Sequence, residues 1–366
     1  MIVSGGGTGG HIFPAIAIAN AVKEQIPDIQ ILFVGANGRM EMKRVPEAGF
    51  EIKGLDIYGL RRKITLKNLI ENLKLPFRVY KSMQSAKAII KDFNPDIVVG
   101  VGGYASGPTL KVAAQMGIPT LIHEANSYPG VTNKLLAKKV DCICITYKSV
   151  EQYFPSEKLV VTGNPIRKDL LEVKYSKEEA LAAFGLNSNK KTLAIIGGSL
   201  GAETINKSVQ SFVEDLIKND IQIIWQTGES YYNCLEDKYK HIEGVKVMPF
   251  VKEMGLLYKA SDIVISRAGA LSLSELCTIG KPCILVPSPN VAEDHQTKNA
   301  SVLANAQAAI MVVDSQAKHQ LKDVVLSTIN DEAKLMSMQE NLLKMGQPNA
   351  AKIIADEVIK LMETKK

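Results

Sequence analysis

A glycine-rich turn lies between an apolar strand and an apolar helix at the start of this chain. The stub Met1–Val3 is followed by Ser4-Gly-Gly-Gly-Thr-Gly-Gly-His11 and then by the apolar run Ile12–Ala19. Glycine lets the backbone turn tightly and lets a ligand approach peptide N–H groups with no Cβ in the way. The positive end of the following helix favours phosphate or developing negative charge. His11 stands where the turn becomes helix, so the sequence predicts a base beside an anion-binding turn.

The same alternation of apolar strand and helix continues along the chain. The predicted strands are 29–34, 96–100, 119–123, 142–146, 158–162, 192–196, 221–226, 245–249, 263–266 and 283–286. A second glycine turn, Gly197–Ala202, follows one of them and opens another helix. Alternating β and α segments with glycines at the strand ends are typical of a doubly wound parallel sheet. The pattern therefore predicts an α/β protein with two similar units in tandem.

A chain of 366 residues exceeds what one hydrophobic core usually organises, so two domains are expected. We place them at residues 1–163 and 164–346, with the joint near Gly163–Lys174 and a helix expected over Lys174–Phe184. The final segment, 347–366, contains an amphipathic helix, Ala350–Glu363, that we expect to pack back on the first domain.

The net charge of +6 is concentrated in one segment. Residues 61–91 contain nine basic side chains and one acidic one, Glu71. Apolar residues are interleaved with these charges around Leu69–Lys81. The pattern fits either an ordinary amphipathic helix with a solvated basic face or a patch that enters an anionic leaflet. Nucleic acid is not expected as a partner, because no binding motif is visible and the remainder of the chain is not basic.

Targeting and redox signals are sparse. We expect no signal peptide and no membrane-spanning segment, since the amino-terminal residues lack a basic region and no apolar run approaches the required length of about 20 residues. The five cysteines form no C-x-x-C pair and are expected to be free thiols. No Asp-x-Asp and no metal-ligand spacing occur, so no metal is expected, and helix dipoles and side chains would stabilise a departing diphosphate.

Three segments allow both a ligand role and a structural one. Gly5-x-Gly7-x-x-Gly10 matches the dinucleotide fingerprint, but no carboxylate ends the second strand, which disfavours NAD. Residues 266–275 start a helix that is either simply capped or holds a diphosphate on its N–H groups and a ribose diol on Glu275. The polar run 294–300 is either a solvated helix start or part of the same site.

With these segments in its sequence, the chain resembles the MurG family of peptidoglycan N-acetylglucosaminyltransferases over nearly its whole length. The motifs that carry the resemblance are Gly5–His11, Gly102–Pro108, His123–Asn126, Gly163–Arg167, Gly197–Ala202, Arg267–Ser272 and Gln296–Ala300. The resemblance implies the GT-B fold, in which two Rossmann-like doubly wound domains face a central cleft. It also implies inverting transfer of N-acetylglucosamine from UDP-GlcNAc to the C4 hydroxyl of undecaprenyl-linked lipid I, giving lipid II and UDP.

The resemblance further implies the residues of the site. The second domain would hold UDP-GlcNAc, a substrate and not a cofactor, and the first would take the acceptor and carry the membrane-facing patch. Predicted substrate contacts are Thr8, Gly9, Gly10, Asn126, Arg167, Ser199, Val251, Ala270, Leu271, Ser272, Leu273, Ser274, Glu275 and Gln296. His11 is the preferred general base and Glu124 the alternative. The implied location is peripheral, on the cytoplasmic face of the inner membrane, with other cell-wall synthesis proteins as partners.

The chain departs from the family pattern in a few places. Ala268 and Ser272 stand where the family has serine and threonine, and Val251 is expected to contact the donor through its backbone. The stub before Ser4 is shorter than the family implies, which suggests a clipped first strand or an upstream start. Two other functions remain open on sequence: another GT-B enzyme that acts on a membrane glycolipid, and a non-catalytic UDP-sugar sensor, which His11 disfavours.

Overall fold

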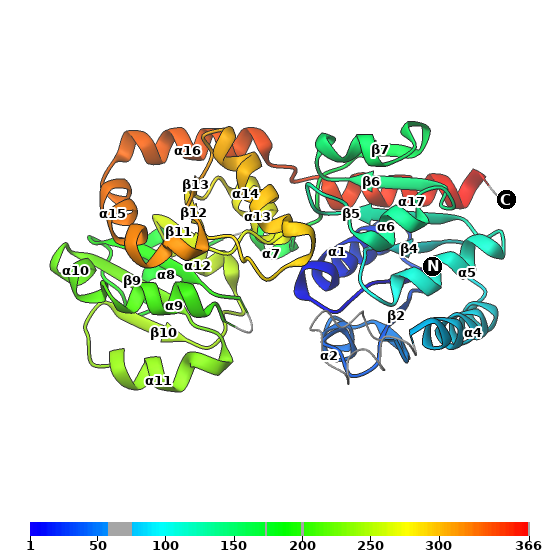
Figure 1. The fold of residues 1–366 in the computed structure, drawn as a ribbon, viewed down its shortest axis with the longest axis horizontal. Helices are drawn as coiled ribbons and strands as arrows, with labels where there is room; N and C mark the ends of the chain where they lie inside the picture. The colour runs from blue at the N-terminus through cyan, green and yellow to red at the C-terminus, as the bar shows by residue number, and fades with distance from the viewer. Residues whose placement is uncertain (58–74, 173, 199–200, 365–366) are drawn as a thin grey trace. The chain divides into compact units, whose positions relative to one another are not determined.

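The chain forms two compact units. The structure is a computed structural model that describes residues 1–57, 75–172, 174–198 and 201–364 (Figure 1). One unit comprises Met1–Arg167 together with Gln347–Lys366, and the other comprises Lys168–Gly346. The sequence placed the boundary at 163–164. The first unit continues to Arg167, whose guanidinium stacks over the ring of Phe13, 5.2 Å from its centre.

A parallel sheet with the order β3-β2-β1-β4-β5-β6-β7 forms the centre of the first unit. Its strands are β1 Ile2–Ser4, β2 Leu32–Ala36, β3 Glu51–Leu55, β4 Val98–Gly100, β5 Thr120–Glu124, β6 Cys142–Ile145 and β7 Leu159–Val161. The direction of strand progression reverses between β1 and β4. Ligands of doubly wound sheets bind outside the carboxyl ends of the strands at such a reversal. The first glycine turn follows β1 and Gly102–Gly103 follow β4, so both glycine segments lie at this position.

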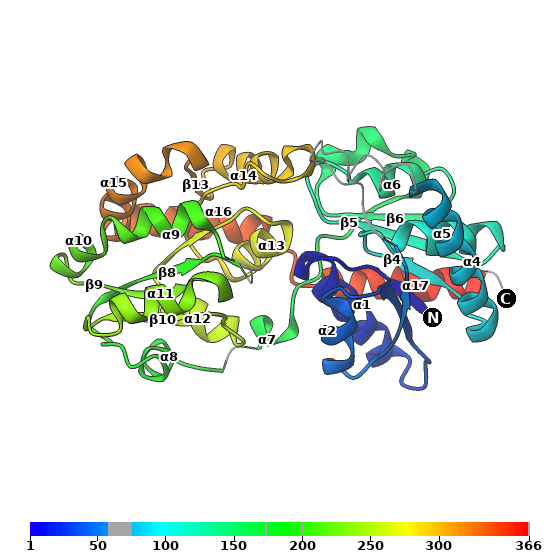
Figure 2. The ribbon, with the colours of Figure 1, turned by 60° about the horizontal axis from the view of Figure 1, so that its bottom comes forward.

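Helices cover both faces of the first sheet. They are α1 Gly9–Gln25, α2 Glu41–Glu47, α4 Leu75–Phe93, α5 Ser106–Gln115, α6 Val131–Leu136 and α17 Ala350–Thr364, with short 3₁₀ turns η1 Lys148–Tyr153 and η2 Ser156–Lys158. The carboxy-terminal helix α17 lies beside α1, as both ribbon views show (Figures 1 and 2). Ile354 and Val358 of α17 are fully buried in the same apolar cluster as Ile12 and Ile18 of α1. The last helix therefore completes the core of the first unit.

The second unit repeats the design with a parallel sheet in the order β10-β9-β8-β11-β12-β13. Its strands are β8 Lys191–Ile196, β9 Ile221–Gln226, β10 Val245–Met248, β11 Ile263–Ser266, β12 Cys283–Leu285 and β13 Ile310–Met311. Here the order reverses between β8 and β11. The second glycine turn follows β8, and the motif that starts at Arg267 follows β11. The sequence-predicted ligand segments of this unit thus also stand at a reversal.

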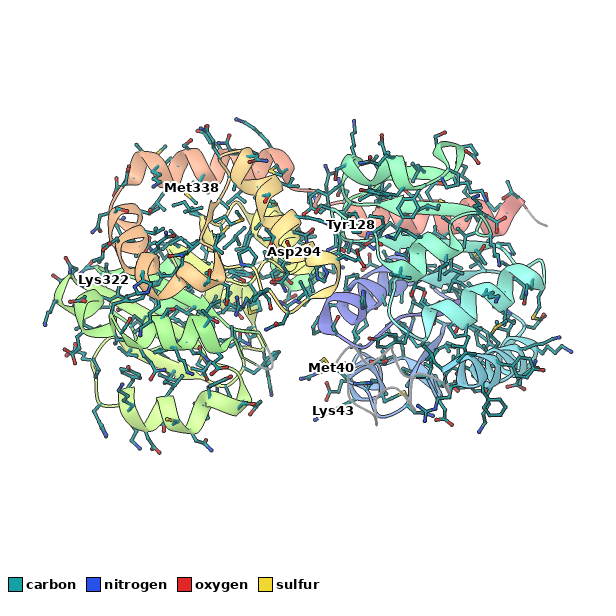
Figure 3. The ribbon with its side chains drawn as sticks, viewed as in Figure 1. Met40, Lys43, Tyr128, Asp294, Lys322 and Met338 are labelled. Carbon is teal, nitrogen blue, oxygen red and sulfur yellow. The ribbon has the colours of Figure 1, made fainter. Side chains whose placement is uncertain are left out.

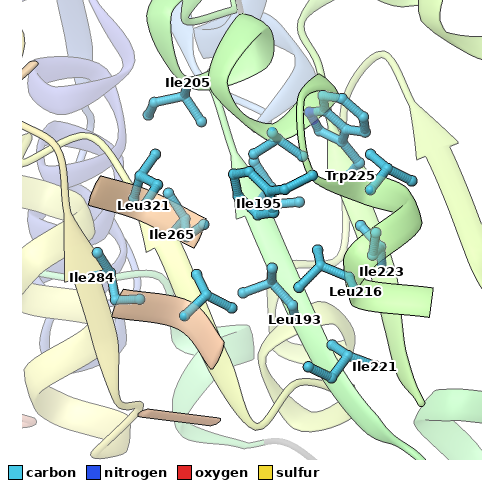
Figure 4. Packing of buried hydrophobic residues seen from close by; sticks show 14 of the residues in the cluster. Leu193, Ile195, Ile205, Leu216, Ile221, Ile223, Trp225, Ile265, Ile284 and Leu321 are labelled. Carbon is cyan, nitrogen blue, oxygen red and sulfur yellow. The ribbon is translucent and has the colours of Figure 1, made fainter. Parts of the chain in front are cut away.

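The remaining helices surround this second sheet. They are α7 Lys168–Leu171, α8 Lys177–Ala183, α9 Glu203–Gln210, α10 Val213–Lys218, α11 Glu229–Tyr239, α12 Met254–Ala260, α13 Ala270–Ile279, α14 His295–Asn305, α15 Ala317–Ile329 and α16 Glu332–Met345, with 3₁₀ turns η3 Ala292–Asp294 and η4 Asp314–Gln316. Trp225, Leu193 and Ile195 fill the centre of the core between sheet and helices (Figure 4). Trp225 also donates its indole N–H to Asn206 Oδ1 at 3.0 Å, which satisfies its polar atom inside the core.

The predicted α/β architecture of two doubly wound sheets is confirmed, whereas several element boundaries were wrong. The sequence missed β3, an edge strand with exposed Glu51, and β13, which has only two residues. The helix expected over Lys174–Phe184 begins at Lys177, because Ser176 accepts from the Glu179 backbone N–H and caps it. The strand expected at 29–34 begins at Leu32, where pairing with Ile2 of β1 starts.

The basic segment is described only in part. Residues 69–74 of the predicted membrane patch lie outside the described residues, and α4 contains the remainder. In the described part of the chain, no helix is both long enough and apolar enough to span a bilayer.

Candidate active site

His11 lies in the first turn of α1 with its ring held by the preceding glycine turn. The ring Nδ1 is 3.0 Å from the backbone oxygen of Gly6. A carbonyl oxygen can only accept, so this contact assigns the proton of the neutral ring to Nδ1. Nε2 then carries the lone pair. The structure thus gives His11 the tautomer that a general base requires.

The second glycine segment packs directly against this turn. Gly102 and Gly103 both have positive φ, at 93° and 87°. A Cβ added to Gly102 would lie 3.0 Å from His11 Nε2, and one added to Gly103 would lie 2.9 Å from the Gly6 backbone nitrogen. Glycine is therefore required at both positions by conformation and by space. The loop after β4 forms one wall around His11.

A carboxylate that sequence reasoning missed anchors the first turn. Glu41 of α2 is buried and accepts from Gly7 N at 2.8 Å and from Ala36 N at 3.0 Å. The sequence could have indicated this residue. The search for a carboxylate that would bind NAD considered only the residues directly after the second strand and found none. Glu41 stands a few residues further on, but it binds protein N–H groups and supports the turn.

Glu124, the alternative base, is fully engaged by its own loop. It ends β5 with 2% of its surface exposed. Its Oε1 accepts from the backbone N–H and side-chain amide of Asn126, at 3.0 and 3.1 Å. Its Oε2 accepts from Gly130 N and Asn133 Nδ2, both at 2.9 Å. A carboxylate with four donors shapes the loop at 125–130, and this geometry favours His11 over Glu124 as base.

The loop after β5 is supported from two sides. His123 of β5 is buried and donates through Nε2 to Gly163 O at 3.0 Å. Burial lowers the pKa of His123 to about 4, so its ring is neutral near neutral pH. Further along the loop, Tyr128 (labelled in Figure 3) packs edge-on against Tyr153 with ring centres 5.2 Å apart, and Lys134 Nζ lies 4.7 Å from the Tyr128 ring centre. The loop that contains Asn126 is therefore held by contacts of His123 before it and of Tyr128 after it.

Several predicted contact residues of the first unit gather at the start of α1. Thr8 is the N-cap residue, and Gly9 and Gly10 form the first helical positions. A Cβ on Gly9 would lie 3.2 Å from the ring of Phe13, over which Arg167 stacks. The structure thus brings Arg167 to the same end of the helix as His11.

The α13 segment of the second unit begins immediately after β11. Gly269 is its N-cap residue and provides no side-chain cap, so the first N–H groups of α13 have no capping side chain from that residue. The predicted contacts Ala270, Leu271, Ser272 and Ser274 are half-buried, whereas Leu273 is fully buried. The backbone N–H of Leu273 donates to Gly269 O at 3.0 Å, so the structure does not support the predicted contact of Leu273 with a ligand.

Glu275 lies in the second turn of α13 and is almost fully buried. Its Oε2 accepts from the hydroxyl of Tyr258 on α12 at 3.2 Å. Val251, another predicted contact, is buried two residues before the N-cap of α12. Ser199 lies outside the described residues.

An ion pair that sequence reasoning missed ties together the loops at the carboxyl ends of the second sheet. Arg267, after β11, pairs with Asp314, after β13. Arg267 also donates to the carbonyls of Val286 and Pro287 after β12, at 3.0 and 3.2 Å. Asp314 Oδ2 accepts from Thr204 Oγ1 of α9 at 3.0 Å. One charged pair thus holds four segments that border the candidate nucleotide site.

The start of α14 completes this edge. Gln296 Oε1 accepts from Ser288 N at 2.8 Å and so holds the loop after β12. Glu293 and Asp294 have positive φ, at 53° and 49°, and Asp294 (labelled in Figure 3) accepts from Thr297 Oγ1 at 2.7 Å. Two consecutive non-glycine residues in the left-handed region store strain, which proteins concentrate near ligand sites.

Comparisons with known proteins identify the family of this chain. Residues 1–145 match the glycosyltransferase family 28 N-terminal domain, and residues 192–354 match the C-terminal domain of that family. Relatives named UDP-N-acetylglucosamine--N-acetylmuramyl-(pentapeptide) pyrophosphoryl-undecaprenol N-acetylglucosamine transferase include that of Bacteroides thetaiotaomicron, 54% identical, covering 99% of this chain and 98% of the relative. The protein of the same name from Parabacteroides distasonis is 51% identical, covering 100% and 99%.

Solved structures give the same result. The crystal structure of MurG from Acinetobacter baumannii superposes with a TM-score of 0.76 at 28% identity, covering 98% of this chain and 99% of that one. UDP-GlcNAc 2-epimerase from Neisseria meningitidis, at 16% identity, 98% coverage of each chain and a TM-score of 0.67, shares only the fold. The two family matches together span most of the chain, and the curated relatives align along its whole length. The chain therefore belongs to glycosyltransferase family 28.

Proposed function

We propose that this chain transfers N-acetylglucosamine from UDP-GlcNAc to the undecaprenyl-linked acceptor lipid I, forming lipid II and UDP. The observation that carries the proposal is full-length identity of 54% to a transferase named for this donor and acceptor. The alternative, a GT-B enzyme for another membrane glycolipid, is not favoured, because several full-length relatives at about half identity are named for the undecaprenyl acceptor. The enzyme is a hexosyltransferase.

His11 serves as the general base of this reaction. Its Nε2 takes the proton of the C4 hydroxyl of the N-acetylmuramyl residue as that oxygen attacks C1 of the donor sugar. The bond between C1 and the UDP oxygen breaks as the new bond forms, so UDP leaves with the electron pair and the product is the inverted β-linkage. Gly6 O supports this step because it accepts from Nδ1–H and stabilises the imidazolium that forms.

The donor lies along the second unit. The uncapped N–H groups at the start of α13 and its helix dipole stabilise the diphosphate, and Glu275 accepts from the ribose hydroxyls. Ser199, Val251 and Gln296 complete the proposed donor contacts, and Thr8, Gly9, Gly10, Asn126 and Arg167 are proposed substrate contacts of the first unit.

UDP binds without a divalent metal in this proposal. Among the described residues, no group of three or more His, Cys, Asp or Glu side chains has metal-binding geometry. Calorimetric titration of UDP with and without excess chelator is expected to give the same affinity. A large loss with chelator would require a metal in the donor complex.

The protein works at the cytoplasmic face of the inner membrane as a peripheral protein, near other cell-wall synthesis proteins. The described part of the basic patch supports this location. Phe77 and Tyr80 of α4 are 72% and 60% exposed, and Arg78 and Lys81 adjoin them. Exposed aromatic and basic side chains on one helix suit an anionic bilayer surface.

One assay tests the proposed reaction. Purified protein is incubated with labelled UDP-GlcNAc and either lipid I or diacylglycerol, and the lipid products are separated. Labelled lipid II with a β-linkage by NMR is expected from lipid I, and no labelled lipid from diacylglycerol. Labelled diacylglycerol alone, or an α-linked product, would contradict the proposal.

A further inference from the structure

An apolar pocket of about 420 Å³ lies in the first unit among α4, α5 and α6. Val79 and Met83 of α4, Pro108 of α5 and Leu135 and Leu136 of α6 line it. Its volume is in the usual range for ligand pockets, roughly 300–1,000 Å³. The proposed transfer chemistry at His11 does not use this pocket.

The pocket continues from the wall of the candidate active site. Gly102 lies against His11, and the chain then leads through Tyr104 into Gly107 at the start of α5. Tyr104 and Gly107 both line the pocket. One short segment therefore connects the reacting centre with the pocket, and an acceptor that reacts at His11 has the pocket beside it.

Two lysines give the pocket an amphipathic character. Lys111 of α5 and Lys139, which follows α6, belong to its lining. Within the ranges that the structure describes, neither makes an ion pair. An apolar interior with cations in its wall complements a ligand that carries a hydrocarbon chain on a phosphate group.

We infer that this pocket binds the first isoprene units of the acceptor's polyprenyl chain. The inference rests on the proposed function. Only a diphosphate separates the reacting sugar from the chain, so when that sugar reaches His11 the nearest isoprene units are drawn out of the bilayer. Exposing these units to water is unfavourable. A pocket that buries them should raise the affinity for the acceptor about fourfold for each methylene-sized group that it buries.

Soluble acceptor analogues test the inference without any membrane. Each analogue carries the N-acetylmuramyl head group of the acceptor and its diphosphate, joined to a prenyl chain of 5, 10 or 20 carbons. Each analogue is used below the concentration at which it aggregates. With saturating UDP-GlcNAc, kcat/KM for the acceptor is expected to rise at least tenfold from the shortest chain to the longer ones. The value of kcat/KM should then level off once the prenyl chain is longer than the pocket can bury.

Two variants fill the pocket from different helices. Thr132→Phe on α6 and Val79→Phe on α4 both replace lining residues with a larger apolar side chain. In each, kcat/KM for the long-chain analogues is expected to fall to the value of the shortest one. The matched control is Val131→Phe on the same helix, since Val131 is 56% exposed and does not line the pocket. This control is expected to keep the full chain-length dependence.

The outcomes separate the inference from the proposed function. The inference that the pocket binds the prenyl chain is overturned by either of two results. One is equal kcat/KM for all chain lengths in the unaltered protein, and the other is unchanged chain-length dependence in both filled variants. Absence of transfer to every analogue overturns the proposed function instead. If Thr132→Phe weakens binding to anionic vesicles but leaves the chain-length dependence in solution, the pocket takes bilayer phospholipid and the inference fails.

Discussion

At the residue scale, the two candidate bases are distinguished by their hydrogen bonds. His11 directs Nδ1 to Gly6 O and so retains a basic Nε2. Glu124 accepts three hydrogen bonds from its own loop and one from Asn133 of α6, so the protein already engages both of its carboxylate oxygens. The difference lies in what surrounds each group, because both residue types serve as bases elsewhere.

Replacing His11 is expected to affect the chemical step. His11→Ala should lower kcat by about 10²–10⁴-fold with little change in UDP affinity, and the acid limb of the pH–rate profile should disappear. Glu124→Gln is the comparison variant. It should retain the acid limb but lose about 1–3 kcal/mol of unfolding free energy, since the amide cannot accept all four bonds. Loss of the limb in Glu124→Gln and its retention in His11→Ala would reverse the assignment.

His123 predicts a pH dependence of stability. Burial lowers its folded pKa from 6.5 to about 4. The folded-state pKa is below the unfolded one, so the stability is fully present above pH 6.5 and is lost as pH falls toward 4. The loss is about 3 kcal/mol over that window.

Urea unfolding at several pH values checks this expectation. His123→Gln keeps an N–H donor for Gly163 but does not titrate, so it should show a shallower fall in unfolding free energy between pH 6.5 and 4 than the unaltered chain. His319→Gln, a change at an exposed histidine, is the control and should leave the slope unchanged. Equal slopes for all three proteins would contradict the account.

At the scale of elements, the second unit joins the ends of its strands through one charged pair. Arg267 and Asp314 are mostly buried, with 19% and 17% of their side chains exposed. Between them they contact the segments that follow β11, β12 and β13, and the first turn of α9. Removing one partner leaves a poorly solvated charge, which costs more than an exposed pair contributes.

A double-mutant cycle measures this coupling. Asp314→Asn and Arg267→Met should each weaken UDP binding at least tenfold by loosening the loops. The loss of UDP binding free energy in the double variant should be smaller than the sum of the two single losses by about 0.5–3 kcal/mol. Lys322→Met breaks the more exposed Lys322–Asp215 pair (Lys322 is labelled in Figure 3) and should change stability little, with UDP affinity retained. Additive effects in the cycle would mean that the two residues act separately.

At the scale of the whole molecule, the uneven charge predicts where the protein binds. Changing Lys74, Arg78 and Lys81 together to Gln should release it from anionic vesicles in a sedimentation assay. Each basic residue near such a surface contributes about 1 kcal/mol. Lys74 lies outside the described residues, and the other two are on α4.

A variant with the same change in net charge controls for long-range attraction. Lys218, Lys238 and Lys318 are exposed on the second unit and can be changed together to Gln. This variant should sediment with vesicles like the unaltered chain. Equal release of both variants would mean that overall charge and not the patch holds the protein on the membrane.

The local pattern of residues determined the fold class of this protein and the segments expected to bind ligands. Apolar runs followed by glycine predicted two doubly wound sheets, because strand formation, tight turns and helix starts depend on residues close together in the chain. The same local segments, Gly5–His11 and Arg267–Glu275, marked the ends of strands where ligands bind in such sheets. The family motifs then suggested the donor and the acceptor.

Tertiary structure alone decided how the side chains are used. The pairing of Arg267 with Asp314, the packing of Gly102 against His11 and the pocket among α4, α5 and α6 join segments far apart in the sequence. Short strands such as β13 exist only because a neighbouring strand pairs with them. Such contacts depend on which distant groups the folded chain brings together, and the local pattern of residues carries no record of that choice.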